Sequence, residues 1–236
     1  FLAKPSHLVF LGLIYPLFGL GLWAVTFTSN ALPLLYPLAS GFALIGPFAA
    51  IGLYEISRQR ELGEEASWLR AFGVLRSPSI PSILALGITL MVIFLVWLTT
   101  ARMLYEWLFG PLAPQSYAQF VNEILTTPRG LALIVLGNAL GFVFAVVVLS
   151  ISVISFPMLL DRDVGAAMAV QTSVRAVIEN PVTMALWGLI VAALLLIGSL
   201  PLFVGLAVVM PVLGHSTWHL YRKVVERAVH EELPVY

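Results

Sequence analysis

The stretch from Val182 to Gly214 is almost entirely apolar and contains no charged residue. Roughly 20 apolar residues suffice to cross a bilayer as a helix, so this stretch is too long for one crossing. The sequence GSLP at 198–201 divides it, because Gly ends a helix readily and Pro fits the first turn of the next helix. We therefore expect two membrane helices here, at 182–199 and 201–221.

The same criterion finds four earlier apolar runs of spanning length. They lie at 7–28, 32–55, 80–104 and 130–155. Hydrophobic residues make up 60% of the 236 residues and charged residues only 10%, whereas soluble domains contain about 25% charged residues. These features predict an all-α polytopic membrane protein, with six transmembrane helices in three hairpins, as a single helical-bundle domain over residues 1–236. The chain begins at Phe1 rather than Met, so we expect further sequence to precede it.

The distribution of basic residues predicts the orientation in the membrane. Of the 12 Lys and Arg residues, only Arg102 and Arg129 lie on the side opposite the termini. Cytoplasmic loops are enriched in Lys and Arg, so we expect both termini on the cytoplasmic side of the membrane. The remaining ten lie on the predicted cytoplasmic side: Lys4, Arg58, Arg60, Arg70, Arg76, Arg162, Arg175, Arg222, Lys223 and Arg227.

Three connectors have the periodicity of short amphipathic helices. Residues 64–76 and 163–179 are expected to lie at the cytoplasmic membrane interface, and residues 115–125 at the opposite face. In 163–179 the aliphatic residues expected on one face are Val164, Ala167, Val170, Val174, Val177 and Ile178. These helices either cover the ends of the bundle or dock a partner protein.

Two segments suggest an internal repeat over 32–104 and 130–199. RELGEEASWLRAFGVLRSP at 60–78 and RDVGAAMAVQTSVRAVIENP at 162–181 both open with Arg, an acid, an aliphatic residue and Gly, and both end at a Pro. Each even-numbered span also contains a proline, at Pro47, Pro157 or Pro211. The copies would have the same orientation, which differs from the inverted repeats of many secondary transporters.

The centres of the spans contain no acidic or basic residue. Charges at that depth usually mark ion or proton paths, so a proton pump, a voltage sensor or an ion pore is not expected. The polar residues that remain can bond to their own helix or to a neighbour. Gly137 and Gly141 form a GxxxG pair in the fourth span, which would allow close helix packing within the chain or in an assembly.

The sequence GHSTWHLYRK at 214–223 allows two interpretations. His215 and His219, one helical turn apart, could ligate a metal together with His7, Asp161 or Glu55, or one of them could ligate haem. The favoured interpretation is a collar at the membrane interface, in which Trp218 and Tyr221 form an aromatic belt while Arg222 and Lys223 reach lipid phosphates. A contact with a connector helix or a partner is the remaining possibility.

The sequence lacks cysteine and the HExxH, GxSxG, P-loop and GxGxxG motifs, so we do not expect an enzyme. A net charge of zero argues against nucleic acid as a partner. We expect an accessory or assembly subunit of a larger membrane complex, with bound lipids and no cofactor. The alternatives are a permease for a small apolar or lipidic solute and a metal- or haem-binding protein.

The sequence PVLGHSTWHLYRKVV at 211–225, with LPLFVGLAVVMP before it and FALIGPFAAIGLYEISRQRELGE near the start, resembles a family of bacterial integral membrane proteins. That family is known as domain of unknown function 2189. The resemblance extends from Pro33 to Val225, and GHSTWHLYR is its most distinctive part. It implies an inner-membrane location and carries over no activity, cofactor or catalytic residue.

Overall fold

The computed structural model describes residues 24, 32–63, 77–112, 114, 116–201 and 203–231. Within these residues all regular structure is helical, which confirms the all-α class. The elements are η1 (Leu32–Leu34), α2 (Leu35–Ala49), α3 (Ile51–Glu61), α5 (Ile80–Phe109), α6 (Tyr117–Thr126), α7 (Pro128–Ser152), α8 (Ser155–Asp161), α9 (Gly165–Glu179), α10 (Pro181–Ser199) and α11 (Leu206–Glu231).

Three helical segments of the described chain are long and apolar enough to cross a membrane. They are α5, the continuous segment Pro128–Asp161 that comprises α7 and α8, and α10. These correspond to the predicted spans at 80–104, 130–155 and 182–199. The predicted span at 7–28 lies outside the described residues, and the spans at 32–55 and 201–221 coincide with η1, α2 and α3 and with α11. Six crossings therefore remain a prediction.

Two of the three predicted proline positions lie beside a helix break. α7 ends at Ser152 and α8 begins at Ser155, just before Pro157. Because Pro157 has no N–H, the carbonyl of Val153 loses its helical partner at the point where the helix is interrupted. The break between α2 and α3 at Ala50 is milder, since the Ala50 amide still donates to the Gly46 carbonyl over 2.9 Å.

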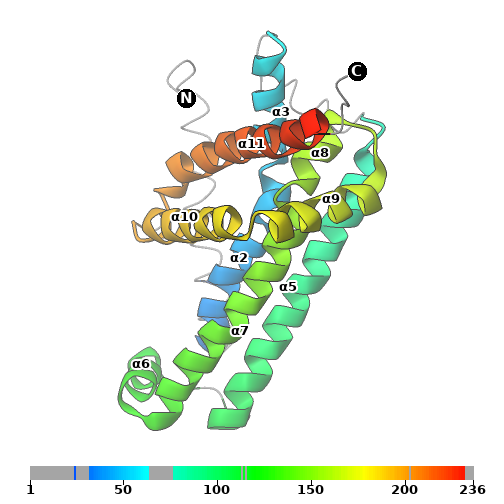
Figure 1. Cartoon of the computed structure of the whole chain (residues 1–236). Coiled ribbons are helices and arrows are strands. Elements are labelled where there is room, and N and C mark those ends of the chain that lie inside the picture. The colour runs from blue at the N-terminus through cyan, green and yellow to red at the C-terminus, as the bar shows by residue number, and fades with distance from the viewer. Residues whose placement is uncertain are drawn as a thin grey trace.

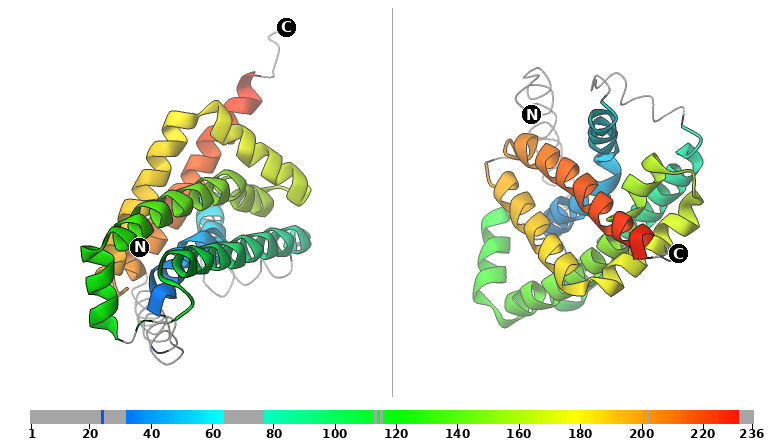
Figure 2. Two further views of the ribbon diagram at one scale, coloured as in Figure 1. Left: turned by 90° about the horizontal axis from the view of Figure 1, so that it is seen from below. Right: turned by 45° about the horizontal axis from the view of Figure 1, so that its top comes forward.

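α2, α5 and α7 run alongside one another, and α6 lies against the start of α7 (Figure 1). α10 and α11 pack together but cross the long axes of α5 and α7 at a steep angle (Figures 1 and 2). The described helices therefore do not form a simple stack of parallel hairpins. The turn between α10 and α11 depends on two glycines, because a Cβ at Gly205 would lie 2.8 Å from the Cα of Gly198.

The predicted connector helices at 163–179 and 115–125 are present as α9 and α6, whereas residues 64–76 lie outside the described part of the chain. The packed face of α9 agrees only in part with the predicted one, since Val164, Val170 and Val177 pack against the core as expected. Its buried residues are Ala169, Ser173 and Ala176, while Ile178 is 71% exposed. The prediction followed large aliphatic residues, but small side chains allow α9 to approach α7 and α8 closely.

Candidate functional site

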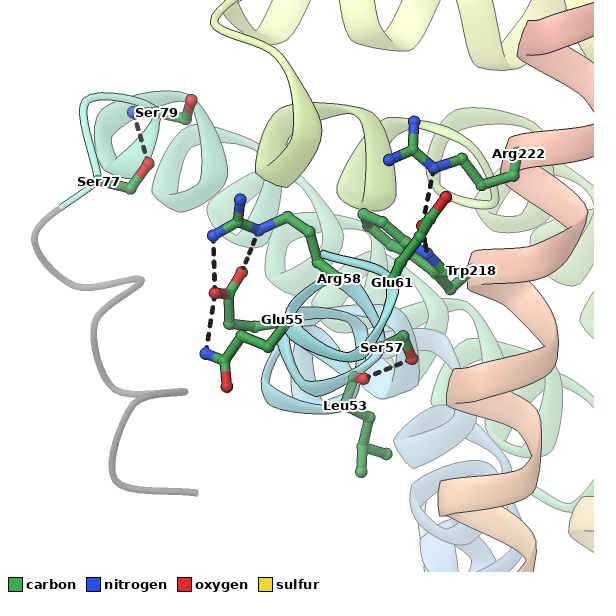
Figure 3. Close-up of polar contacts among 10 residues, drawn as sticks. Leu53, Glu55, Ser57, Arg58, Glu61, Ser77, Ser79, Trp218 and Arg222 are labelled. Carbon is green, nitrogen blue, oxygen red and sulfur yellow. Dashed lines mark hydrogen bonds and ion pairs between the residues drawn. The ribbon is translucent and has the colours of Figure 1, made fainter. Parts of the chain in front are cut away.

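The ends of α3 and α8 meet the second half of α11 (Figure 1), and the polar side chains of the three helices bond to one another there. Glu61 is the last residue of α3. Its Oε2 accepts a hydrogen bond of 2.8 Å from Trp218 Nε1 and one of 3.0 Å from Arg222 Nε. Figure 3 shows the Glu61 carboxylate between these two side chains of α11. The Glu61 carboxylate thus binds two side chains of α11 at once.

Asp161 makes the corresponding contact from α8. It is the last residue of that helix, and its Oδ2 accepts 2.7 Å from the Tyr221 hydroxyl and 2.9 Å from Arg222 Nη1. Arg162 Nε lies 3.5 Å from the same oxygen. We call Glu61, Asp161, Trp218, Tyr221 and Arg222 the Arg222 network. The guanidinium of Arg222 bridges the carboxylates of Glu61 and Asp161, which come from separate parts of the chain.

The Arg222 network corrects the predicted aromatic belt. Trp218 and Tyr221 are both 0% exposed, so neither can face lipid in this structure. Residues 218, 221 and 222 lie at i, i+3 and i+4, on one face of α11, and that face packs on α3 and α8. The Arg222 Cζ lies 5.2 Å from the Trp218 ring centre and 5.7 Å from that of Tyr221, within the range of cation–π attraction. Lys223, in contrast, is exposed.

The charge of Arg222 is stabilised by this environment. Partial burial by itself would lower the pKa of Arg222, but the hydrogen bond to Glu61 and the charges of Asp161 and Glu61 raise it overall. Its side chain is 22% exposed and that of Asp161 is 13% exposed. The pair is therefore less screened by solvent than an ordinary surface ion pair.

The two histidines have different surroundings. His215 is half-buried, and its Nδ1 lies 2.6 Å from Ser57 Oγ on α3. Because the Ser57 hydroxyl also donates to the Leu53 carbonyl over 2.9 Å, the protonated Nδ1 of His215 is the consistent donor to Ser57. His219 is exposed on the adjacent face. His215 therefore serves the contact between α3 and α11.

The predicted metal ligands do not come together among the described residues. No group of three His, Asp or Glu side chains with metal-binding geometry is present in that part of the chain. Asp161 is bonded to Tyr221 and Arg222 instead, and His7 lies outside the described residues. A site at His215 and His219 would need ligands from elsewhere, and it stays a hypothesis.

The sequence did not point to Glu61 as a site residue, and Glu55 was considered instead as a candidate metal ligand. Glu55 is buried and forms a separate pair within α3, accepting 2.8 Å and 2.9 Å from the guanidinium of Arg58 and 3.0 Å from Gln59 (Figure 3). In the sequence, Glu61 stood out only as the acidic residue of the repeated Arg-acid-aliphatic-Gly pattern. The available signal was spacing, since Glu61 lies one helical turn after Ser57, on the face that contacts α11.

The GxxxG pair of α7 faces α5 within the chain. A Cβ at Gly141 would lie 3.3 Å from the Trp97 ring, and one at Gly137 would lie 3.9 Å from Leu104. Asn138 between them donates to the Ile134 carbonyl over 2.8 Å and accepts 2.9 Å from the Tyr36 hydroxyl. The predicted self-bonding of the other span residues is also present in Thr99, Thr100, Ser150, Ser152 and Ser155, each of which donates to the carbonyl four residues before it.

The helical fold and its three long apolar helices are those of a helical integral membrane protein. Residues 35–161, from the start of α2 to the end of α8, match the family described as predicted integral membrane protein (DUF2189), and the chain belongs to that family. The match contains Glu61 and Asp161 but ends before α11. The segment 214–222, which we expected to be its most distinctive part, therefore lies outside it. No curated protein and no solved structure matches the chain.

Proposed function

We propose that this protein is a non-catalytic, multi-pass accessory or assembly subunit of a larger complex in a bacterial inner membrane. The observation that carries the proposal is the contrast between its polar and apolar side chains. The charged groups of the Arg222 network bind one another, while the spans present long apolar faces outwards. On α7 and α10, Phe142 is 70% exposed and Leu189 is 66% exposed. Such faces suit lipid and other membrane helices.

The proposed topology has six crossings in three hairpins with both termini in the cytoplasm. Its support is the position of the basic residues. Arg58 and Arg162 belong to the end where α3 and α8 meet, whereas Arg129 lies at the start of α7, beside α6, at the other end (Figure 1). The positive-inside tendency would put the end with α3 and α8 in the cytoplasm.

Crosslinking in native membranes tests the proposal. A photoreactive residue placed at Phe142 on α7 or at Leu189 on α10 should give adducts with the same second protein after purification of the full chain in mild detergent. Trp107, which is 74% exposed near the end of α5, provides the comparison position. A chain that purifies alone, with lipid adducts at all three positions, would contradict a role as a subunit.

A permease is the second candidate, and the break between α7 and α8 is the observation that favours it, because interrupted helices are common at transport sites. The packing of the core counts against a permease, because Leu90, Ile154 and Phe156 are each 0% exposed there. A groove of about 450 Å³ lies further along α5, beside the Arg102–Glu106 ion pair. Flux of a lipidic solute into vesicles that contain the purified protein would favour the permease over the subunit.

Metal or haem binding is tested on the purified chain. Elemental analysis and a visible absorption spectrum should be compared between the natural protein and a variant with His215→Ala and His219→Ala. A stoichiometric metal or a haem band that disappears in the variant would support the site.

A further inference from the structure

One continuous face of α11 changes from apolar to basic along its length. Val208 and Val212 are 50% and 45% exposed, and His219 and Lys223 are exposed further along the helix. Steps of four, seven and four residues place all four on one side of a helix. We call these residues the α11 strip. It lies beside the face that forms the Arg222 network.

Arg60 of α3 adds a third basic group to the polar end of the α11 strip. α11 crosses α3 (Figure 1), and the contacts follow the same order along both helices, since Leu53 lies against Gly214, Ser57 against His215 and Glu61 against Trp218. Arg60 is one turn beyond Ser57, and His219 is one turn beyond His215. Arg60 is exposed and close enough to His215 to interact with it electrostatically.

The basic groups of this region are available for a ligand. Within the described part of the chain, Arg60 and Lys223 form no ion pair, whereas the nearby carboxylates of Glu61 and Asp161 are bound by Arg222. The Arg222 network therefore engages two nearby carboxylates that would otherwise be free to pair with these basic groups. Basic side chains at a membrane interface attract anionic lipid headgroups.

We propose that the α11 strip, together with Arg60, binds an anionic phospholipid. Its phosphate contacts Arg60, His219 and Lys223, and one acyl chain lies along Val208 and Val212. The order of side chains along α11 matches the order of groups in a phospholipid. The basic residues correspond to the phosphate headgroup, and the valines before them correspond to the acyl chain. This site does not depend on whether the protein is a subunit of a complex.

Lipid retention by the purified full chain tests the proposal. The protein is equilibrated in detergent with equal amounts of phosphatidylglycerol and phosphatidylcholine, and the bound lipid is measured by native mass spectrometry. Each basic residue at a membrane surface contributes about fivefold to the binding of anionic lipid. The natural chain should prefer phosphatidylglycerol, and the double variant Arg60→Gln with Lys223→Gln should lose at least about fivefold of that preference.

Two matched variants separate charge from folding. Arg60→Lys with Lys223→Arg keeps both charges and should keep the preference. Arg102→Gln with Arg129→Gln removes the same charge from the other end of the helices and should also keep it. An unchanged preference in the first double variant, or equal retention of the two lipids by the natural chain, would overturn the proposal.

A competition experiment identifies the source of the phosphate. Inorganic phosphate at millimolar concentration should not displace phosphatidylglycerol, because it cannot contact Val208 and Val212. Val212→Asn should weaken lipid retention while the basic groups stay in place. Displacement by inorganic phosphate, together with no effect of Val212→Asn, would show a site for free anions and would contradict a lipid site.

Discussion

Arg222 Nη1 lies 2.9 Å from Asp161 Oδ2, and this ion pair joins the C-terminal helix to the end of α8. The same guanidinium donates to Glu61 at the end of α3. α3 and α8 each follow a helix break near a proline, and each ends in the carboxylate that Arg222 binds. α11 thereby joins two segments that α5, α6 and α7 separate in the sequence.

Replacing Arg222 should destabilise the protein. Arg222→Met would leave Glu61 and Asp161 without their shared partner, at a cost of about 1.5–3 kcal/mol for the lost charged hydrogen bonds. Arg222→Lys should recover only part of the lost free energy of unfolding, because an ammonium cannot reproduce the planar, two-pronged geometry of the guanidinium. The melting temperature in mild detergent should fall by about 3–10 °C for the methionine variant.

The control for Arg222 is Arg102→Met. Arg102 binds Glu106 over 2.7 Å, but its side chain is 68% exposed. Exposed pairs contribute about 0–1 kcal/mol, so the melting temperature should barely change. Equal effects of Arg222→Met and Arg102→Met would show that the Arg222 network adds no more than a surface pair.

Tyr221→Phe isolates the hydroxyl of the network. The phenyl ring keeps the packing of a side chain that is 0% exposed, while the 2.7 Å bond to Asp161 is lost. We expect a loss of about 1–2 kcal/mol in the free energy of unfolding. A double-mutant cycle with Asp161→Asn measures the coupling, and additive effects of the two changes would contradict a direct bond.

Gly130→Ala should disturb the contact between α6 and α7. A Cβ at Gly130 would collide with the carbonyl oxygens of Glu123 and Ile124, and backbone atoms cannot move aside as a side chain can. We expect a cost of about 1–3 kcal/mol. Gly137→Ala is the matched control on the same helix, because its nearest atom would be Leu104 Cδ2 at 3.9 Å. Thermal unfolding that is the same for both variants would show that the α6 contact is not tight.

Cysteine labelling tests the orientation, and the chain offers a clean background because it contains no cysteine. Arg129→Cys at the start of α7 should react with a membrane-impermeant maleimide added to intact cells. Arg162→Cys, just after α8, should react only after the membrane is opened. Labelling of both positions from the same side would contradict the proposed topology.

Local signals in the sequence were sufficient where structure depends on near neighbours. α6 lies within one or two residues of its predicted position, because Ser116 caps it by accepting a bond from the Gln119 amide. The spans at α5 and α10 were likewise predictable from apolar length alone. The packed face of α9 was predictable only for its valines, since Ala169, Ser173 and Ala176 are small residues whose burial depends on a neighbouring helix.

The aromatic and basic residues of α11 likewise show what local sequence predicts and what depends on neighbouring helices. The sequence placed Trp218, Tyr221 and Arg222 at the end of an apolar segment, and at such a position a lipid-facing collar and a buried contact have the same composition. Only the tertiary structure decides between them, because it brings Glu61 and Asp161 within hydrogen-bonding distance of that face.

The sequence by itself determined that the chain is helical and belongs in a membrane, since apolar length and scarcity of charge are properties of each segment separately. It also determined where the helices are weakened by proline. The tertiary structure decided which carboxylates Arg222 binds and which face of α11 stays exposed. Those choices depend on contacts between residues more than 60 positions apart, and the periodicity of a single helix contains no information about them.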